Sequence, residues 1–282
     1  MHTWNDFLKL TDELSDINLY HEEYGSGEET LIFIHGFGVS LYTWRRLVRP
    51  LSEQFKVILI DLKGFGKSPK PEDKHYSVYL QASLLVQFIK RQDIKKMTIV
   101  GHSYGGGISL IASLYFMNRD RERLKRLILL DSVAYEQVLP PFVHILRIPL
   151  VGRASVLIPA RVQVLSMMKE AYLDEKQITK EAVSAYSKPL DEPGGRHAII
   201  ETARQMIPAD LDKLSRRYGE IDIPVLIVWG LEDSIIPLQF GERLNNDLPD
   251  SRLEIIKNCG HAPQEEKPKE TIRIFIDFLN SH

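Results

Sequence analysis

Short apolar runs recur along the chain and alternate with longer stretches in which apolar residues return at helical spacing. Strands of a sheet that is covered on both faces have no polar alternation, so the short runs are typical of buried strands. We expect strands over residues 17–24, 31–34, 55–60, 97–100, 127–130, 225–229 and 253–256. We expect helices over residues 44–54, 76–91, 108–114, 240–248 and 270–279. This alternation predicts an α/β fold with a mostly parallel central sheet and helices on both faces.

The alternation stops between about residues 133 and 218, where prolines interrupt helical stretches and no buried strand stands out. We therefore expect residues 134–218 to form a helical cap between two sheet strands, and residues 1–133 and 219–282 to form the core. Within the cap, residues 145–159 are strongly apolar, with Arg147 and Arg153 as their only charges. Two interpretations are open, because this run can line a pocket for an acyl or aromatic group or simply pack on the core.

Composition narrows the class of protein. A net charge of −2 over 282 residues gives no basic excess for nucleic-acid binding. No stretch approaches the roughly 20 apolar residues of a membrane span, and the first ten residues lack the apolar region of a signal peptide. Cys259 is the only cysteine, so no disulfide within the chain is possible. A reducing, cytoplasmic location fits these features.

The segment Gly101-His102-Ser103-Tyr104-Gly105 follows an apolar run and precedes a helical pattern. A Gly-x-Ser-x-Gly sequence between a strand and a helix is typical of a nucleophile elbow, in which a sharp turn presents the serine. Such a turn holds the serine in a strained backbone conformation. The flanking glycines are needed because β-carbons there would crowd the strand against the helix. Ser103 is therefore the candidate nucleophile.

A serine hydroxyl is a weak nucleophile, so it needs a base and a carboxylate that orients the base. His261 follows the last predicted strand, and Asp233 follows the strand over residues 225–229. Both positions lie at the carboxyl edge of the predicted sheet, where catalytic groups gather. The order Ser103, Asp233, His261 is the serine–acid–histidine order of this architecture. Asp131, which also ends a strand, and Glu232 are alternatives for the acid.

An oxyanion hole needs two preorganised N–H donors. We expect one from Tyr104, which follows the nucleophile, and one from Phe37 in the loop His35-Gly36-Phe37-Gly38. The glycine-rich segment 61–68 lacks the spacing of a phosphate-binding loop and is predicted to be a structural turn. No cluster of histidine, cysteine and aspartate has the spacing of metal ligands, so we expect neither a metal nor a cofactor.

Together these loops resemble the α/β-hydrolase superfamily, in its capped single-domain branch. The resemblance covers nearly the whole chain and implies a serine hydrolase with the triad Ser103, Asp233 and His261. Epoxide hydrolases and haloalkane dehalogenases of this fold use aspartate as nucleophile, so a serine favours acyl transfer. Hydrolases of aromatic ring-cleavage products tend to have a Gly-Pro-Gly loop and a tryptophan after the histidine. This chain has Phe37-Gly38-Val39 and Ala262 at those places.

The expected reaction is hydrolysis of carboxylic esters of small to medium acyl or aromatic substrates through an acyl-enzyme. Carbon–carbon bond hydrolysis of the ring-cleavage type is an alternative activity. A small-molecule sensor with little turnover is an alternative from another class of function. The expected partner is thus a small ester-like molecule, and the oligomeric state stays open.

Overall fold

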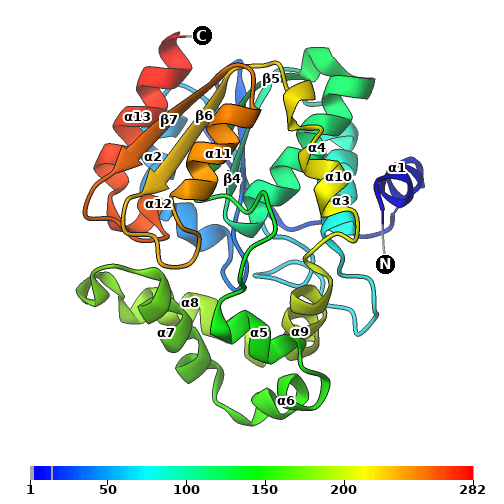
Figure 1. Cartoon of the computed structure of the whole chain (residues 1–282), viewed down its shortest axis with the longest axis vertical. Coiled ribbons are helices and arrows are strands. Elements are labelled where there is room, and N and C mark those ends of the chain that lie inside the picture. Colours follow the sequence, from blue (N-terminus) through cyan, green and yellow to red (C-terminus); the bar gives the residue numbers. More distant parts are fainter. Residues whose placement is uncertain (1–2, 14, 282) are drawn as a thin grey trace.

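A seven-stranded sheet forms the centre of the computed structural model, which describes residues 3–13 and 15–281 (Figure 1). The strand order is β1-β3-β2-β4-β5-β6-β7, and within this sheet β1 runs antiparallel to β3 while the other neighbours are parallel. The strands are β1 (His21–Tyr24), β2 (Thr30–Ile34), β3 (Lys56–Ile60), β4 (Met97–His102), β5 (Leu124–Leu130), β6 (Val225–Gly230) and β7 (Ser251–Ile256). The predicted α/β fold with a mostly parallel sheet is confirmed.

Helices cover both faces of the sheet. Four contribute to one apolar layer: α1 (Trp4–Asp12), α3 (Val78–Arg91), α4 (Tyr104–Arg119) and α11 (Gln239–Asp247). The opposite layer contains α2 (Arg45–Ser52) and α13 (Pro268–Ser281). Leu127 and Leu129 of β5 enter the first layer, whereas Ile128 and Leu130 enter the second. This double burial explains why the inner strands are largely apolar, whereas the edge strands β1 and β7 contain charged residues.

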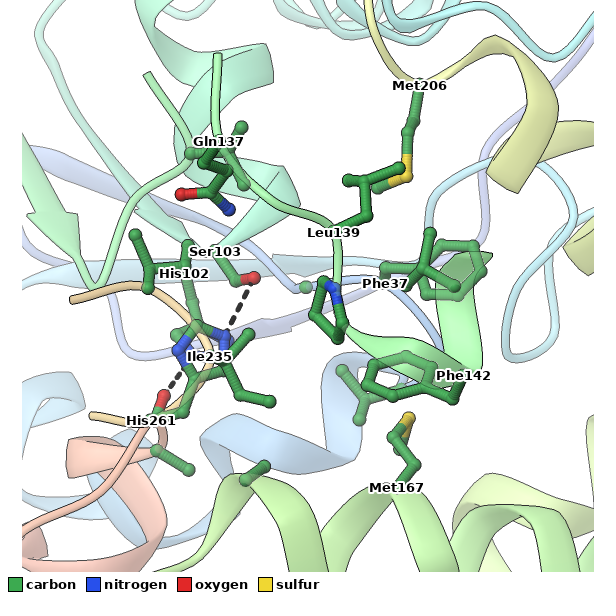
Figure 2. A pocket seen from close by; sticks show the side chains of 18 of the residues that line it. Phe37, His102, Ser103, Gln137, Leu139, Phe142, Met167, Met206, Ile235 and His261 are labelled. Carbon is green, nitrogen blue, oxygen red and sulfur yellow. Dashed lines mark hydrogen bonds between the residues drawn. The ribbon is translucent and has the colours of Figure 1, made fainter. Parts of the chain in front are cut away.

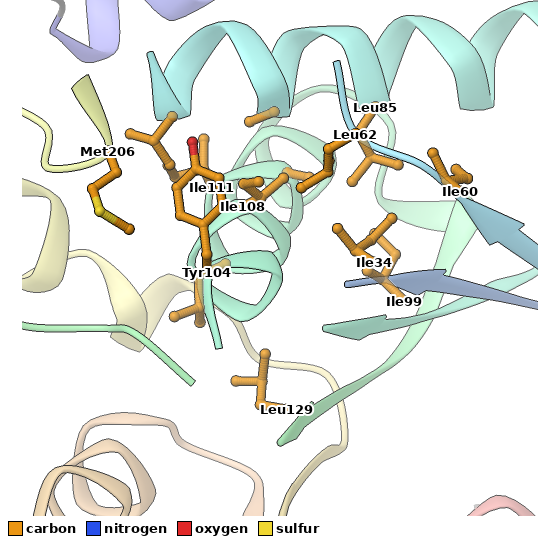
Figure 3. Packing of buried hydrophobic residues seen from close by; sticks show 14 of the residues in the cluster. Ile34, Ile60, Leu62, Leu85, Ile99, Tyr104, Ile108, Ile111, Leu129 and Met206 are labelled. Carbon is orange, nitrogen blue, oxygen red and sulfur yellow. The ribbon is translucent and has the colours of Figure 1, made fainter. Parts of the chain in front are cut away.

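The layer under α3 and α4 shows how tightly the sheet is covered (Figure 3). Ile108 and Ile111 of α4 and Leu85 of α3 gather beside Ile34 and Ile99 of the two central strands. All five side chains are almost completely buried. This packing holds β4 and α4, the two elements on either side of Ser103, in a fixed relation.

Several element boundaries differ from those predicted. The first strand begins at His21 rather than at residue 17. The helix predicted over residues 44–54 begins with a 3-10 turn, η1 (Leu41–Trp44), and α2 ends at Ser52. Two short helices, α1 and α12 (Pro263–Glu266), were not predicted because neither is long enough to show a clear periodicity. Residues 61–68 form a turn, as predicted.

Residues 134–218, here named the cap segment, lie between β5 and β6, and most of them fold over the lower end of the sheet in Figure 1. The last helix of the segment instead returns to the side of the core, where Asp210 accepts from the hydroxyl of Tyr79 at 2.7 Å. Its helices are α5 (Pro141–Arg147), α6 (Pro149–Ala154), α7 (Ala160–Ala171), α8 (Lys180–Asp191), α9 (Gly195–Gln205) and α10 (Leu211–Ser215), with 3-10 turns η3 (Ser155–Leu157) and η4 (Glu175–Gln177). In the apolar run over residues 145–159, Leu146 is buried, but Leu150 and Leu157 are 80% and 83% exposed. The interpretation that this run simply packs on the core therefore holds for only some of its residues.

No helix among the described residues combines the length and the apolar character that a membrane crossing requires.

Candidate active site

Ser103 occupies the sharp turn between β4 and α4. Its φ of 52° and ψ of −118° place it in a region that non-glycine residues rarely adopt. The Ser103 N–H donates to the carbonyl of Leu130 at 2.9 Å, and its own carbonyl accepts from the N–H of Gly106 at 2.9 Å. These bonds to β5 and to α4 hold the turn, so the strain is supported from both sides.

The glycines on either side of the turn have no room for a side chain. A β-carbon on Gly101 would lie 2.4 Å from the Ser109 Oγ, and one on Gly105 would lie 2.3 Å from the carbonyl oxygen of Ile34. Both distances are far below van der Waals contact. The strand and the helix can therefore approach each other closely enough to form the elbow only with glycine at these positions.

Ser103, His261 and Asp233 form a continuous hydrogen-bonded chain (Figure 2 shows the Ser103–His261 part). The Ser103 hydroxyl lies 2.9 Å from His261 Nε2, and His261 Nδ1 lies 2.8 Å from Asp233 Oδ2. With Nδ1 protonated, the histidine donates to the carboxylate and accepts from the serine. This is the arrangement that an imidazole needs in order to take the serine proton. All three side chains are at most 9% exposed.

The carboxylate of Asp233 is held in its charged form. Burial works to raise its pKa, but the neighbouring His261 and the N–H groups of Ile235 and Ile236 outweigh burial and lower the pKa below its ordinary value. Those two N–H groups donate to Asp233 Oδ1 at 2.8 and 3.0 Å. One oxygen is thus fixed by the backbone and the other by the imidazole, so the orientation of His261 is strongly determined.

The two alternative acids have other partners. Asp131 Oδ1 accepts the N–H of Gly230 at 2.9 Å, and Glu232 Oε2 accepts the N–H of Cys259 at 3.0 Å. Burial, together with the adjacent Asp233 carboxylate, raises the pKa of Asp131 well above its ordinary value. Negative charge in the aspartate pair is therefore favoured on Asp233, beside the histidine.

Asp131, Asp233 and His261 each place a ligand-type atom within 4.8 Å of the others. The sequence did not indicate this cluster, because its members are far apart along the chain. A metal ion there would compete with the hydrogen bond between Asp233 and His261. The donor set therefore fits the acid–base chain better than a metal site.

His102 and His35 support the site without facing the Ser103 hydroxyl. His102 Nε2 lies 2.7 Å from the carbonyl oxygen of His261, and burial lowers the pKa of His102 to about 3. The ring is therefore neutral, and its Nε2–H donates to that carbonyl. His35 Nδ1 donates to the carbonyl of Gly36 at 2.7 Å, and its Nε2 accepts the N–H of Leu62 at 3.1 Å. These contacts fix the loops that carry His261 and Phe37.

The two expected oxyanion donors lie beside the nucleophile. Tyr104 is the first residue of α4, so its N–H has no acceptor within that helix. The preceding loop comes so close that a β-carbon on Gly36 would lie 3.2 Å from the β-carbon of Ser103. Gly36, Phe37 and Ser103 line the same cavity. The backbone around Phe37 is thus in position to face an oxygen bound at Ser103.

The cap segment is hydrogen-bonded to both loops that carry the acid and the base. The N–H of His261 donates to the carbonyl of Ala171 at 2.8 Å, and the Ser234 hydroxyl donates to the carbonyl of Glu170 at 2.8 Å. Buried Glu266 accepts the N–H groups of Gly260 at 3.0 Å and of Leu173 at 2.9 Å. The sequence did not indicate a role for Glu266, although its place five residues after His261 could have suggested one.

A cavity of about 1040 Å³, its mouth included, opens above Ser103 and His261 between the core and the cap segment. Side chains of the cap segment, together with Phe37, make its walls largely apolar (Figure 2). A polar patch interrupts these walls where Glu265 accepts from Thr43 at 2.9 Å and from the hydroxyl of Tyr186 at 2.7 Å. The guanidinium of Arg45, which is not among the residues that line the cavity, forms an ion pair with the same carboxylate at 2.5 Å. No local pattern in the sequence indicated this patch.

A family model for the alpha/beta hydrolase fold matches residues 29–157 and 164–268. The chain belongs to the alpha/beta hydrolase family. Members of this family whose crystal structures resemble it include an alpha/beta hydrolase fold protein from Burkholderia ambifaria, with a TM-score of 0.82 and 27% identity over 93% of this chain and 94% of that chain. A variant of the meta-cleavage product hydrolase CumD has a TM-score of 0.78 and 25% identity over 94% of this chain and 96% of that chain.

Curated relatives of this alpha/beta hydrolase include the uncharacterized hydrolase YugF of Bacillus subtilis (strain 168). It is 29% identical over 269 residues, which are 93% of this chain and 94% of that protein. The 2-hydroxy-6-oxononadienedioate/2-hydroxy-6-oxononatrienedioate hydrolase 1 of Pseudomonas putida is 28% identical over 286 residues, which are 97% of this chain and 95% of that protein.

Proposed function

We propose that this alpha/beta hydrolase cleaves carboxylic ester bonds through a covalent acyl-enzyme on Ser103. The observation that carries the proposal is the hydrogen-bonded chain from Ser103 through His261 to Asp233, which opens into a largely apolar cavity. Such a chain activates a serine hydroxyl toward a carbonyl carbon.

In the first step, His261 takes the proton from Ser103 as the serine oxygen attacks the ester carbonyl. Asp233 stabilises the imidazolium that forms, and the N–H groups of Phe37 and Tyr104 stabilise the negative carbonyl oxygen. His261 then gives its proton to the departing alcohol. In the second step, His261 takes a proton from water, whose oxygen attacks the acyl carbon, and then gives that proton to the departing Ser103 oxygen, so that the acid is released and the serine hydroxyl is restored.

Hydrolysis of a carbon–carbon bond is a second candidate, favoured by the likeness to the Pseudomonas putida hydrolase. The substrates in that enzyme's name are dicarboxylates, which proteins usually bind with arginine or lysine. Among the described residues that line the cavity there is no lysine or arginine, whereas the carboxyl groups of Glu136 and Glu265 are present. This charge pattern favours an uncharged ester.

Two substrates separate these activities. We expect purified enzyme to hydrolyse p-nitrophenyl butanoate with a kcat/KM at least tenfold above that for 2-hydroxy-6-oxononadienedioate. A preference for the dicarboxylate would overturn the ester assignment in favour of carbon–carbon hydrolysis. Reaction with a fluorophosphonate without turnover of either substrate would contradict both activities and indicate a sensor.

A further inference from the structure

A second cavity, of about 830 Å³ with its mouth included, is lined by the cap segment and by Phe37 and Gly38 of the core. The two cavities share three lining residues, namely Phe37, Phe142 and Met167. These side chains therefore form the partition between the two spaces. In Figure 2 they lie across the catalytic cavity from His261.

The partition is made of packing contacts. The rings of Phe37 and Phe142 are stacked with their centroids 6.5 Å apart. Met167 packs over Gly38, where a β-carbon would lie 2.7 Å from its sulfur. An unbranched methionine changes rotamer easily and accommodates ligands of different shape. Rotation of Met167 can thus connect the two cavities without a movement of the backbone.

The chemistry of the second cavity suits a hydrocarbon. No charged residue lines it among the described residues, and most of the lining is aliphatic or aromatic. Its polar groups include Gln163, whose Nε2 donates to the carbonyl of Ser155 at 2.5 Å, and the Ser155 hydroxyl, which donates to the carbonyl of Gly152 at 2.6 Å. These two donors are bonded within the protein itself, so neither calls for a polar ligand.

The second cavity opens at the surface of the cap segment. Three of its lining residues, Ile145, Ile158 and Val162, are 44%, 46% and 56% exposed. An occupant that enters past Met167 is therefore not limited by a closed end wall. Apolar side chains at this outlet also lose contact with water when an alkyl chain covers them, which favours binding.

We propose that the second cavity binds the distal part of a long acyl chain whose ester carbonyl lies at Ser103. This inference rests on the proposed ester hydrolysis and adds a substrate class, esters of long-chain fatty acids. The partition then divides the acyl site into an inner part, which every ester occupies, and an outer part, which only a long chain reaches.

The test compares kcat/KM for p-nitrophenyl laurate with that for p-nitrophenyl acetate, below the concentration at which laurate forms micelles. V162W fills the outlet and V162D places a charge there, which an alkyl chain would have to desolvate. Val162 is exposed, so both variants are expected to fold. L150W and L150D are the matched controls, because Leu150 is also exposed in the cap segment but lines neither cavity.

We expect both Val162 variants to lower the laurate-to-acetate ratio at least tenfold, and both Leu150 variants to keep it within twofold of the wild-type value. M167A, which widens the partition, should raise the ratio. An unchanged ratio in V162W and V162D, with acetate still hydrolysed, would overturn the second cavity as the acyl site and leave the proposed ester hydrolysis standing. Wild-type enzyme that hydrolyses neither ester would contradict the proposed function, and this inference with it.

Discussion

The nucleophile elbow and the cap segment face the same cavity but are held in place by different means. Every residue from 97 to 106 is buried, and the backbone of Ser103 is bonded to a neighbouring strand and to its own helix. The cap segment instead exposes large apolar side chains such as Leu150 and Leu157. Its polar contacts with the core include the hydrogen bonds around Ala171 and Glu266 and the bond from the Tyr186 hydroxyl to Glu265.

This difference separates the proposed chemistry from the proposed selection of substrate. Bond cleavage needs atoms placed to within a fraction of an ångström, which a close-packed sheet supplies. Selection of an acyl chain needs an apolar space whose shape can differ between relatives, which an inserted helical segment supplies. Changes at the elbow should therefore abolish turnover, whereas changes at the cap surface should leave the chemistry intact.

The largest expected effect is at the nucleophile. S103A should lower kcat/KM for p-nitrophenyl butanoate at least about 10³-fold, because it removes the hydroxyl on which we propose that the acyl-enzyme forms. The matched control is S113A, which removes a buried hydroxyl elsewhere on α4 that has no hydrogen-bond partner among the described residues. It should retain turnover within about twofold. Both variants should unfold at close to the wild-type temperature, and near-normal turnover by S103A would refute the role of Ser103.

The next effect concerns how the free energy of unfolding of the protein depends on pH. His102 has a folded-state pKa of about 3, whereas an unfolded histidine titrates near pH 6.5. Between these values the unfolded chain binds the proton and the folded chain does not, so stability falls as the pH falls. This one group contributes a loss of at most about 1.4 kcal/mol per pH unit.

Urea unfolding between pH 7 and pH 5 measures this loss. H102Q should show a shallower decline in the free energy of unfolding than the wild type. H144Q, which changes an exposed histidine of the cap segment, should follow the wild-type curve. Equal slopes for wild type and H102Q would contradict the assignment.

A smaller effect is expected where the cap segment meets the His261 loop. E266Q keeps the shape of the side chain but removes its charge and one of the acceptor oxygens that bind Gly260 and Leu173. Because His261 is then less firmly oriented, kcat should fall about tenfold with little change in KM. E270Q, on the exposed side of α13, is the control and should behave as wild type. A change confined to KM would show that Glu266 acts on the cavity and not on His261.

The smallest effect is expected at the exposed surface of the cap segment. L157S replaces a leucine that is 83% exposed and should change the free energy of unfolding by less than about 0.5 kcal/mol. L129A, in the completely buried centre of the sheet, should cost about 2–5 kcal/mol. Urea unfolding measures both changes. If L157S lowers the free energy of unfolding by more than about 1 kcal/mol, Leu157 makes stabilising contacts that its exposure does not indicate.

The sequence predicted the core far better than the cap segment, and the reason is physical. Buried parallel strands are unbroken apolar runs, and the elbow needs glycines at fixed spacing, so residues 97–105 could be recognised directly. The partners of Ser103 could be proposed because loops after parallel strands meet at one edge of the sheet. The pairing of Asp131 with Asp233, and the link from Glu266 to Leu173, depend on contacts between distant segments. Those contacts leave no local pattern.

Within the cap segment, the apolar run over residues 145–159 had two open interpretations, and hydrophobicity alone could not separate them. The structure divides the run, since Ile145, Leu146 and Ile158 line a cavity while Leu157 is exposed. Helix packing angles decide which side chains turn inward, and these angles follow from the whole surface of the core rather than from the run itself.

The most direct test of the account is to find where a fluorophosphonate reacts. After brief exposure of wild-type enzyme and S103A to the reagent, peptide mass spectrometry locates the phosphonyl group. The account predicts a single adduct, on the peptide that contains Ser103, and no adduct in S103A. An adduct on another residue, or equal labelling of both proteins, would show that the chain from Ser103 to Asp233 does not activate this serine.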